Sequence, residues 1–258
     1  MDREEQKHRL GGMALSNGVL VHGPTSWACA VRTDDGELKV VAERKQLSSD
    51  VRSPLLRGPV KLLEAVAFLP RLKRALPEAR LPFERREVIA AMLGTAIVVQ
   101  GVRRSRLGDA SKELVGGLLA VAPAMLSLRE QSLTAYHGAE HIAIGTYEHG
   151  ETRAREHERC GSHLVGPMLA ATAAGNILAA KLPERVRPAG RLAATVGAVA
   201  VSTELFAWMQ RHEGHPLARA LARPGHELQH RFATAQPTPE QLEVAEAALR
   251  ACLELEDA

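Results

Sequence analysis

The chain has 258 residues, 45% of them hydrophobic, and a formal net charge of +3. That length is enough for one large domain or two small ones around a substantial apolar core. The basic residues are spread over many segments, so the charge pattern gives no support to nucleic-acid binding. The three cysteines are far apart and odd in number, which argues against a disulfide framework and for a reducing compartment.

The N-terminal part of the chain predicts a small β unit. It begins with MDREEQKHRL, which lacks the apolar core of a signal peptide, so we expect the first domain to stay in the cytoplasm. Short apolar runs separated by turn residues predict strands at 19–21, 27–31 and 38–41, with a tight turn at 34–36. The polar composition of residues 46–58 indicates a linker.

The rest of the chain is predicted to be helical. Pro59 suits the first position of a helix, and Pro70 should kink or end that helix. A basic connector follows at 71–86. Four apolar runs then predict helices at 88–102, 114–128, 164–180 and 192–209.

These four runs suit either a membrane or a soluble bundle. As helices the first two would span about 22 Å and the last two about 25–27 Å, against a hydrocarbon core of about 30 Å. The chain is only 3% aromatic, so it lacks the belt of Trp and Tyr side chains that membrane proteins usually place at the membrane interface. The basic loops 103–106 and 181–191 should lie on one side, with the metal segment and both termini on the other. A soluble antiparallel bundle would carry the site at one end.

The stretch 136–163 contains five of the eleven histidines and indicates a metal site. On a helix His137 and His141 are one turn apart, so both imidazoles can reach one ion. With Glu140 they form H-x-x-E-H, the inverted zinc-hydrolase pattern in which the glutamate is the general base. The alternative is a chance pair of histidines on an amphipathic helix.

A catalytic zinc needs a third protein ligand. His157 and Cys160 are candidates, because their H-x-x-C spacing lets both converge from one turn. Glu204 is another, since a carboxylate in an apolar run is costly to bury unless it is paired or binds metal. Glu148 would lie about 10 Å along the helix axis from His141, too far to bind the same ion on a continuous helix.

A second motif lies near the C terminus. His226, Glu227 and His230 form H-E-x-x-H, the direct zinc-protease signature. The flanking prolines leave room for only about two or three helical turns, so this motif ranks below the first one, although it could add ligands to the same ion. After it, Thr238 and Gln241 form a capping box that predicts a packing helix at 238–256.

Several of these motifs together resemble a known family. YHGAEH, YEHGE and HERCGSH, with GGMALSNGVLVHGP near the start and PGHELQHRFATAQPTPEQLEVA near the end, resemble the uncharacterised YqhQ-like bacterial family labelled "predicted metal-dependent enzyme". The resemblance runs in order over nearly the whole chain. It implies metal dependence and a multi-pass membrane protein.

We therefore predict a mainly α (α+β) fold, with a small N-terminal β unit and linker at 1–58 and a helical domain at 59–258. This helical bundle would carry membrane-associated hairpins, the metal segment 136–163 and the capped helix 238–256. The expected partner is membrane lipid and not nucleic acid, with the metal site facing the cytoplasm; a cytoplasmic protein is the alternative.

The expected cofactor is one divalent metal ion, with zinc as the predicted ion. Its predicted ligands are His137 and His141 with one or two of His157, Cys160 and Glu204. Three ligands would leave a position for water, with Glu140 as base and hydrolysis as the reaction. Four ligands would make the zinc structural, in a non-enzymatic membrane or assembly protein. A third possibility is a metal-free helical interaction protein.

Overall fold

The structure is a computed structural model that describes residues 7–45, 51 and 53–258. Its N-terminal part is a four-stranded antiparallel meander in the order β1-β2-β3-β4. The strands are β1 (Gly11–Leu15), β2 (Gly18–His22), β3 (Ser26–Arg32) and β4 (Leu38–Arg44). The first of these, at Gly11–Leu15, was not predicted, because two glycines obscure its alternation.

Eight α-helices follow in the described part of the chain, so the predicted fold class, mainly α with a small N-terminal β unit, is confirmed. They are α1 (Pro54–Ala75), α2 (Arg86–Arg104), α3 (Asp109–Ser127), α4 (Gln131–His149), α5 (Val165–Ala180), α6 (Arg187–Arg211), α7 (Pro216–Leu228) and α8 (Pro239–Glu256). Short 3-10 turns, η1 (Pro82–Glu84) and η2 (Gly161–Leu164), and a π-helical segment, η3 (Gln229–Ala233), connect them.

Both faces of the sheet are covered. Residues 19, 21, 28 and 30 of β2 and β3 face α4 and α8, where they share a core with Ile144, Val244 and Cys252. The alternate residues face the end of α1, where Trp27 and Cys29 pack against Leu72. This alternation follows from the two-residue period of a strand. The boundary predicted at residue 58 stays a prediction, but the core of the sheet is completed by helices from the far end of the chain.

The helix α1 differs from the sequence prediction at both prolines. It begins at Pro54 and contains Pro59 and Pro70. Of the predicted linker at 46–58, residues 46–50 and 52 lie outside the described residues. Pro54 takes the first position of α1, where the missing N–H would have no helical partner, whereas Pro59 and Pro70 lie inside the helix. The predictions that a helix starts at Pro59 and that a connector begins at residue 71 were wrong, since α1 extends beyond both.

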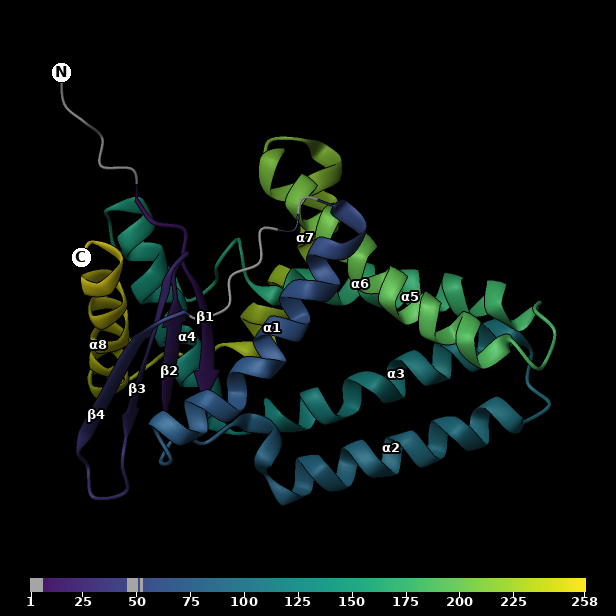
Figure 1. The fold of residues 1–258 in the computed structure, drawn as a ribbon, viewed down its shortest axis with the longest axis horizontal. Coiled ribbons are helices and arrows are strands. Elements are labelled where there is room, and N and C mark those ends of the chain that lie inside the picture. The colour runs from purple at the N-terminus through teal and green to yellow at the C-terminus, as the bar shows by residue number, and fades with distance from the viewer. Residues whose placement is uncertain (1–6, 46–50, 52) are drawn as a thin grey trace.

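The four apolar runs form two helical hairpins that extend away from the sheet (Figure 1). We call α2 with α3 the first arm and α5 with α6 the second arm. The second arm is tightly packed, because Gly175 leaves room for Ala194 to approach. Both basic loops lie at the same end of the molecule, opposite the sheet and α8 (Figure 1).

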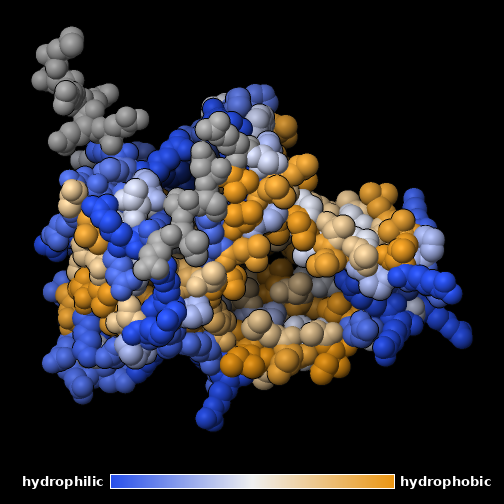
Figure 2. Space-filling model, in the orientation of Figure 1, coloured by the Kyte–Doolittle hydropathy of each residue, from blue (hydrophilic) through white to orange (hydrophobic). Residues whose placement is uncertain are grey.

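The arms carry much of the exposed apolar surface. Figure 2 shows apolar residues along both arms and hydrophilic residues capping their far ends. The segment Gly161–Ala180 and the helix Arg187–Arg211 are each long and apolar enough to cross a membrane. The helices α3 and α4 together would also qualify, but they are bent by 88°. Because α4 is buried against the sheet, we assign it to the globular part.

Candidate metal centre

The helix α4 provides the first two candidate ligands. It ends at His149 and is capped by Gly150, whose φ of 75° gives the left-handed conformation that commonly closes a helix. His137 and His141 are one turn apart, and their ring centroids are 4.3 Å apart. His141 is 2% exposed. The predicted helical pair therefore exists and points into the protein.

Both imidazoles are oriented by backbone carbonyl groups. His137 Nδ1 lies 2.8 Å from the carbonyl oxygen of Ala233, and His141 Nδ1 lies 2.6 Å from that of Arg155. A carbonyl oxygen can only accept a hydrogen bond, so Nδ1 carries the proton in each ring. The lone pair of each Nε2 is then free. This is the arrangement by which metal-binding histidines are usually held.

Cys160 supplies the third donor from the loop that precedes η2. Its Sγ lies 3.6 Å from His137 Nε2. One donor atom from each of His137, His141 and Cys160 lies within 4.8 Å of the others. Zinc bonds of about 2.05 Å to nitrogen and 2.3 Å to sulfur at a tetrahedral angle would separate N and S by about 3.6 Å. The three side chains fit such an ion with little movement.

Glu140 lies beside this group and is 7% exposed. Its Oε2 is 3.9 Å from His137 Nε2. Burial raises the pKa of Glu140 to about 7, although the neighbouring charge of His137 acts in the opposite direction. Burial, followed by the charge of His137, lowers the pKa of His141 to about 2, so this imidazole is neutral and able to bind metal.

The close approach of Glu140 to the sheet depends on Gly12. A Cβ at Gly12 would lie 2.6 Å from Glu140 Cγ, with the carboxylate still closer. Any larger residue would therefore collide with the Glu140 side chain. This gives Gly12, the second residue of β1, a definite role next to the candidate metal centre.

His157 is held in a different way from the other histidines. Its ring centroid is 5.5 Å from that of His141, but its Nε2 lies 3.0 Å from Glu148 Oε2. Arg159 also forms an ion pair with Glu148. The interaction with Glu148 occupies the Nε2 of His157, so the structure does not bring His157 into the ligand group.

Gln229 is a supporting residue that sequence reasoning missed. It is fully buried, and its Oε1 accepts a hydrogen bond of 2.8 Å from His157 N. Its Nε2 donates to His157 O at 3.2 Å and to Ser162 Oγ at 2.8 Å. Gln229 therefore fixes the loop on both sides of Cys160. The one signal in the sequence was its place within the H-E-x-x-H motif at 226–230, which by itself indicates only a source of metal ligands.

The structure places Glu204 on α6, away from the ligand group. Arg57 of α1 donates two hydrogen bonds of 2.7 Å, one to each carboxylate oxygen of Glu204. This pairing satisfies the carboxylate in its apolar run and joins α1 to α6. The expectation that Glu204 binds the metal receives no support from this position.

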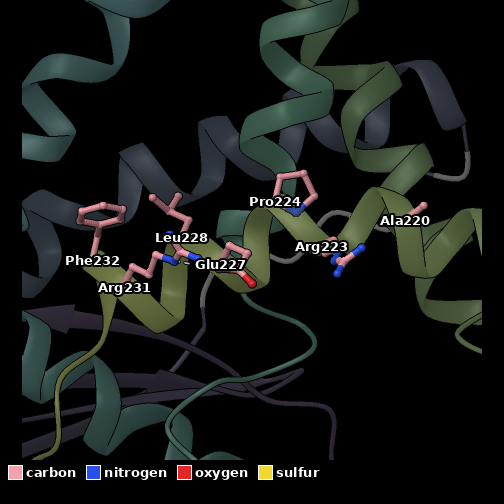
Figure 3. Close-up of a pocket in the computed structure, with 7 residues that line it drawn as sticks. All are labelled: Ala220, Arg223, Pro224, Glu227, Leu228, Arg231 and Phe232. Atoms are coloured by element: carbon pink, nitrogen blue, oxygen red, sulfur yellow. Dashed lines mark ion pairs between the residues drawn. The ribbon is translucent and has the colours of Figure 1, made fainter.

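The second motif does not assemble a ligand group in the described part of the chain. His226 is exposed, His230 Nδ1 lies 2.8 Å from Glu156 Oε1, and Glu227 pairs with Arg231 (Figure 3). Pro224, Leu228 and Phe232 line a groove along α7 and η3 in the same view. The π-helical turn at Gln229–Ala233 instead presents its last carbonyl group to His137. Such turns are frequent at functional sites.

The fold and the site together define an α+β protein with two apolar helical arms and a His-His-Cys group that could hold a metal ion. A family model described as "Protein of unknown function (DUF1385)" matches residues 124–255, just over half of the chain. The chain therefore belongs to this family. The match covers all three residues of the candidate metal centre. No curated protein and no solved structure gives a significant match.

Proposed function

We propose that the protein is a membrane-anchored metalloprotein that binds one zinc-like divalent ion through His137, His141 and Cys160. The observation that carries the proposal is the convergence of three donor atoms within 4.8 Å, with both imidazoles oriented by carbonyl groups. Imidazole and thiolate are the ligands that zinc prefers. Three protein ligands leave the fourth position open.

We propose hydrolysis as the reaction. A zinc ion at an open site acidifies water and polarises a carbonyl group. Glu140 is placed to move a proton, because its carboxylate lies 3.9 Å from His137 Nε2 on the same face of α4. Burial raises the pKa of Glu140 to about 7 in the absence of a cation, and a bound dication would lower it, which favours the carboxylate form that a general base needs. The buried surroundings strengthen its interactions with charges that develop nearby.

A structural zinc site is the second candidate function. It would require a fourth protein ligand, and His157 is the nearest histidine, with its ring centroid 5.5 Å from that of His141. To bind, His157 would have to leave Glu148, whose carboxylate would then keep its ion pair with Arg159. The intact His157–Glu148 interaction favours the open site over the closed one.

The first experiment measures metal content by elemental mass spectrometry on protein purified in detergent without a histidine tag. About one zinc per chain is expected for the wild type, as for any single-ion site. His141→Ala and Cys160→Ala should lose it. His230→Ala is the matched control, since His230 is exposed and pairs with Glu156. Metal lost equally from the control, or absent from the wild type after reconstitution, would refute the proposal.

A second experiment separates the open site from the closed one. Cobalt replaces zinc, and the visible spectrum is recorded before and after adding azide. An open position predicts that azide changes the ligand-field bands, and Cys160→Ala should remove the sulfur-to-cobalt charge-transfer band. His157→Ala should leave the bands of the wild type in place. If azide leaves the wild-type spectrum unchanged while the spectrum of His157→Ala differs from that of the wild type, the structural zinc site is favoured.

We also propose that the metal segment faces the cytoplasm. Both arms return to the side on which they start, so the sheet, α4 and α8 lie on one side of the apolar region (Figure 1). A reporter fused after α8 therefore reports the side of the metal centre. If the centre faces the cytoplasm, green fluorescent protein fused to the C terminus should fluoresce, and alkaline phosphatase fused at the same place should be inactive. The reverse pattern would place the centre outside.

A further inference from the structure

The far ends of the two arms form a strongly basic cap on an apolar surface. Residues 103–113 and 181–191 together contain eight basic and three acidic residues. Directly behind this cap the arms expose large apolar side chains, including Ile97 at 73% and Leu192 at 67% exposure. The change from apolar flank to charged end is visible in Figure 2. A cap of this kind suits the region where hydrocarbon gives way to headgroups.

Three arginines from both arms converge within this cap. Arg191 lies close enough to Arg103 and Arg187 to be repelled by their charges, and Glu113 and Asp109 provide partial compensation. The carboxylate of Glu113 already accepts a hydrogen bond of 2.8 Å from Asn176 Nδ2. The arginines therefore have more positive charge than their neighbours neutralise.

Two of these arginines also have donors that no described residue satisfies. The Nε atoms of Arg187 and Arg191 are both buried and have no hydrogen-bond acceptor among the described residues. Arg187 uses Nη2 to reach the carbonyl oxygen of Leu182 at 3.2 Å. Buried donors normally have partners, so each unsatisfied one requires an explanation. A bound anion between the arms would supply the missing acceptors and offset the repulsion.

We propose that Arg103, Arg187 and Arg191 form a binding site for the phosphate of an anionic phospholipid. Arginine binds phosphate with several donors at once, which suits a planar guanidinium whose Nε is free. The adjoining exposed side chains Val186 and Leu192 would contact the acyl chains. This apolar border favours a lipid phosphate over a free one. The inference requires the arms to lie in a bilayer, but it does not depend on the metal centre.

The test compares lipids in the intact protein. Wild-type protein in dodecyl maltoside is titrated with phosphatidylglycerol or with phosphatidylcholine of the same chain length, and bound lipid is counted by native mass spectrometry. The wild type should prefer phosphatidylglycerol. Arg187→Gln/Arg191→Gln should weaken its binding roughly 20- to 30-fold, since each basic residue near an anionic headgroup contributes about a fivefold change in affinity. Arg187→Lys/Arg191→Lys should retain part of the preference.

The control is Arg219→Gln/Arg223→Gln, which removes two exposed arginines of α7 outside the cap. It should bind phosphatidylglycerol as the wild type does. Equal binding of both lipids by the wild type, unchanged binding by Arg187→Gln/Arg191→Gln, or full competition by inorganic phosphate at equal concentration would each overturn the proposal. If that variant is not monodisperse, Arg103→Gln is measured instead, and unchanged binding there overturns it as well. Zinc content in the same samples tests the proposed function separately.

Discussion

Replacing Gly12 by alanine should destabilise the protein by forcing Glu140 out of its position. The new methyl group would lie 2.6 Å from Glu140 Cγ and closer to the carboxylate, well inside normal contact. Glu140 is buried on a helix that packs against the sheet, so its side chain has little room to move. Gly12→Ala should therefore act as overpacking at this interface.

The expected cost is about 1–3 kcal/mol, the usual range for an extra methyl group in a packed site. For a chain of this size that corresponds to a fall of roughly 2–4 °C in unfolding temperature for each kcal/mol. Unfolding in detergent can be followed by tryptophan fluorescence, because Trp27 is 2% exposed in the core of the sheet. The metal should stay bound, since no ligand atom is displaced directly.

A double-mutant cycle tests the cause. Glu140→Ala removes the three atoms nearest to the new methyl group, so Gly12→Ala should cost little in that background. The coupling energy should nearly equal the cost of Gly12→Ala alone. If the cost is the same with and without the Glu140 side chain, the strain lies elsewhere and the placement of Glu140 against Gly12 is wrong.

Three further predictions use the same preparations. Gln229→Ala should lower stability by about 1–3 kcal/mol, because the buried N–H and C=O groups of His157 lose their partner; an unchanged unfolding temperature would contradict this. Burial alone would raise the pKa of Glu256, but hydrogen bonds led by that of Ser26 outweigh it and lower the pKa from its ordinary value of 4.5. Such a carboxylate stabilises the fold above the unfolded-state pKa and loses this effect as pH falls through the folded-state pKa. The difference in unfolding free energy between wild type and Glu256→Gln should therefore be constant from pH 7 to about pH 5 and shrink below it. Glu204→Gln should keep its full metal content, because the carboxylate is held by an arginine of α1; lost metal would restore it as a ligand.

Much of the architecture could be predicted because it depends on local patterns. Each of the four apolar runs became a helix, and the capping box of Thr238 and Gln241 starts α8 as expected. The prediction that both basic loops lie at one end is consistent with the hairpin pairing in Figure 1. The i, i+4 pair of His137 and His141 could be predicted for the same reason, since helical spacing alone sets their common face.

The parts that could not be predicted depend on contacts between distant segments. Nothing near His157 indicates that Glu148 and Gln229 will hold it, and the distances are set by how the loop after α4 folds back. Likewise the H-E-x-x-H motif has the right residues for zinc, but a π-helical turn and the pairing of His230 with Glu156 direct it to another role. Spacing gives the reach of a side chain, whereas its partner is decided by the tertiary fold.

The candidate metal centre is assembled from segments that are far apart in the chain. Its donors come from α4 and the loop before η2, its supporting groups come from η3, and Glu140 fits only because β1 has a glycine opposite it. The connector before α8 is tied to α4 as well, since Ala235 N donates a hydrogen bond of 2.9 Å to the carbonyl oxygen of Thr134. No isolated segment provides this geometry, so an ion that binds here binds the folded chain and stabilises it. Removing such an ion should therefore loosen β1, η3 and the loop before η2 together, because each of them helps to build the centre.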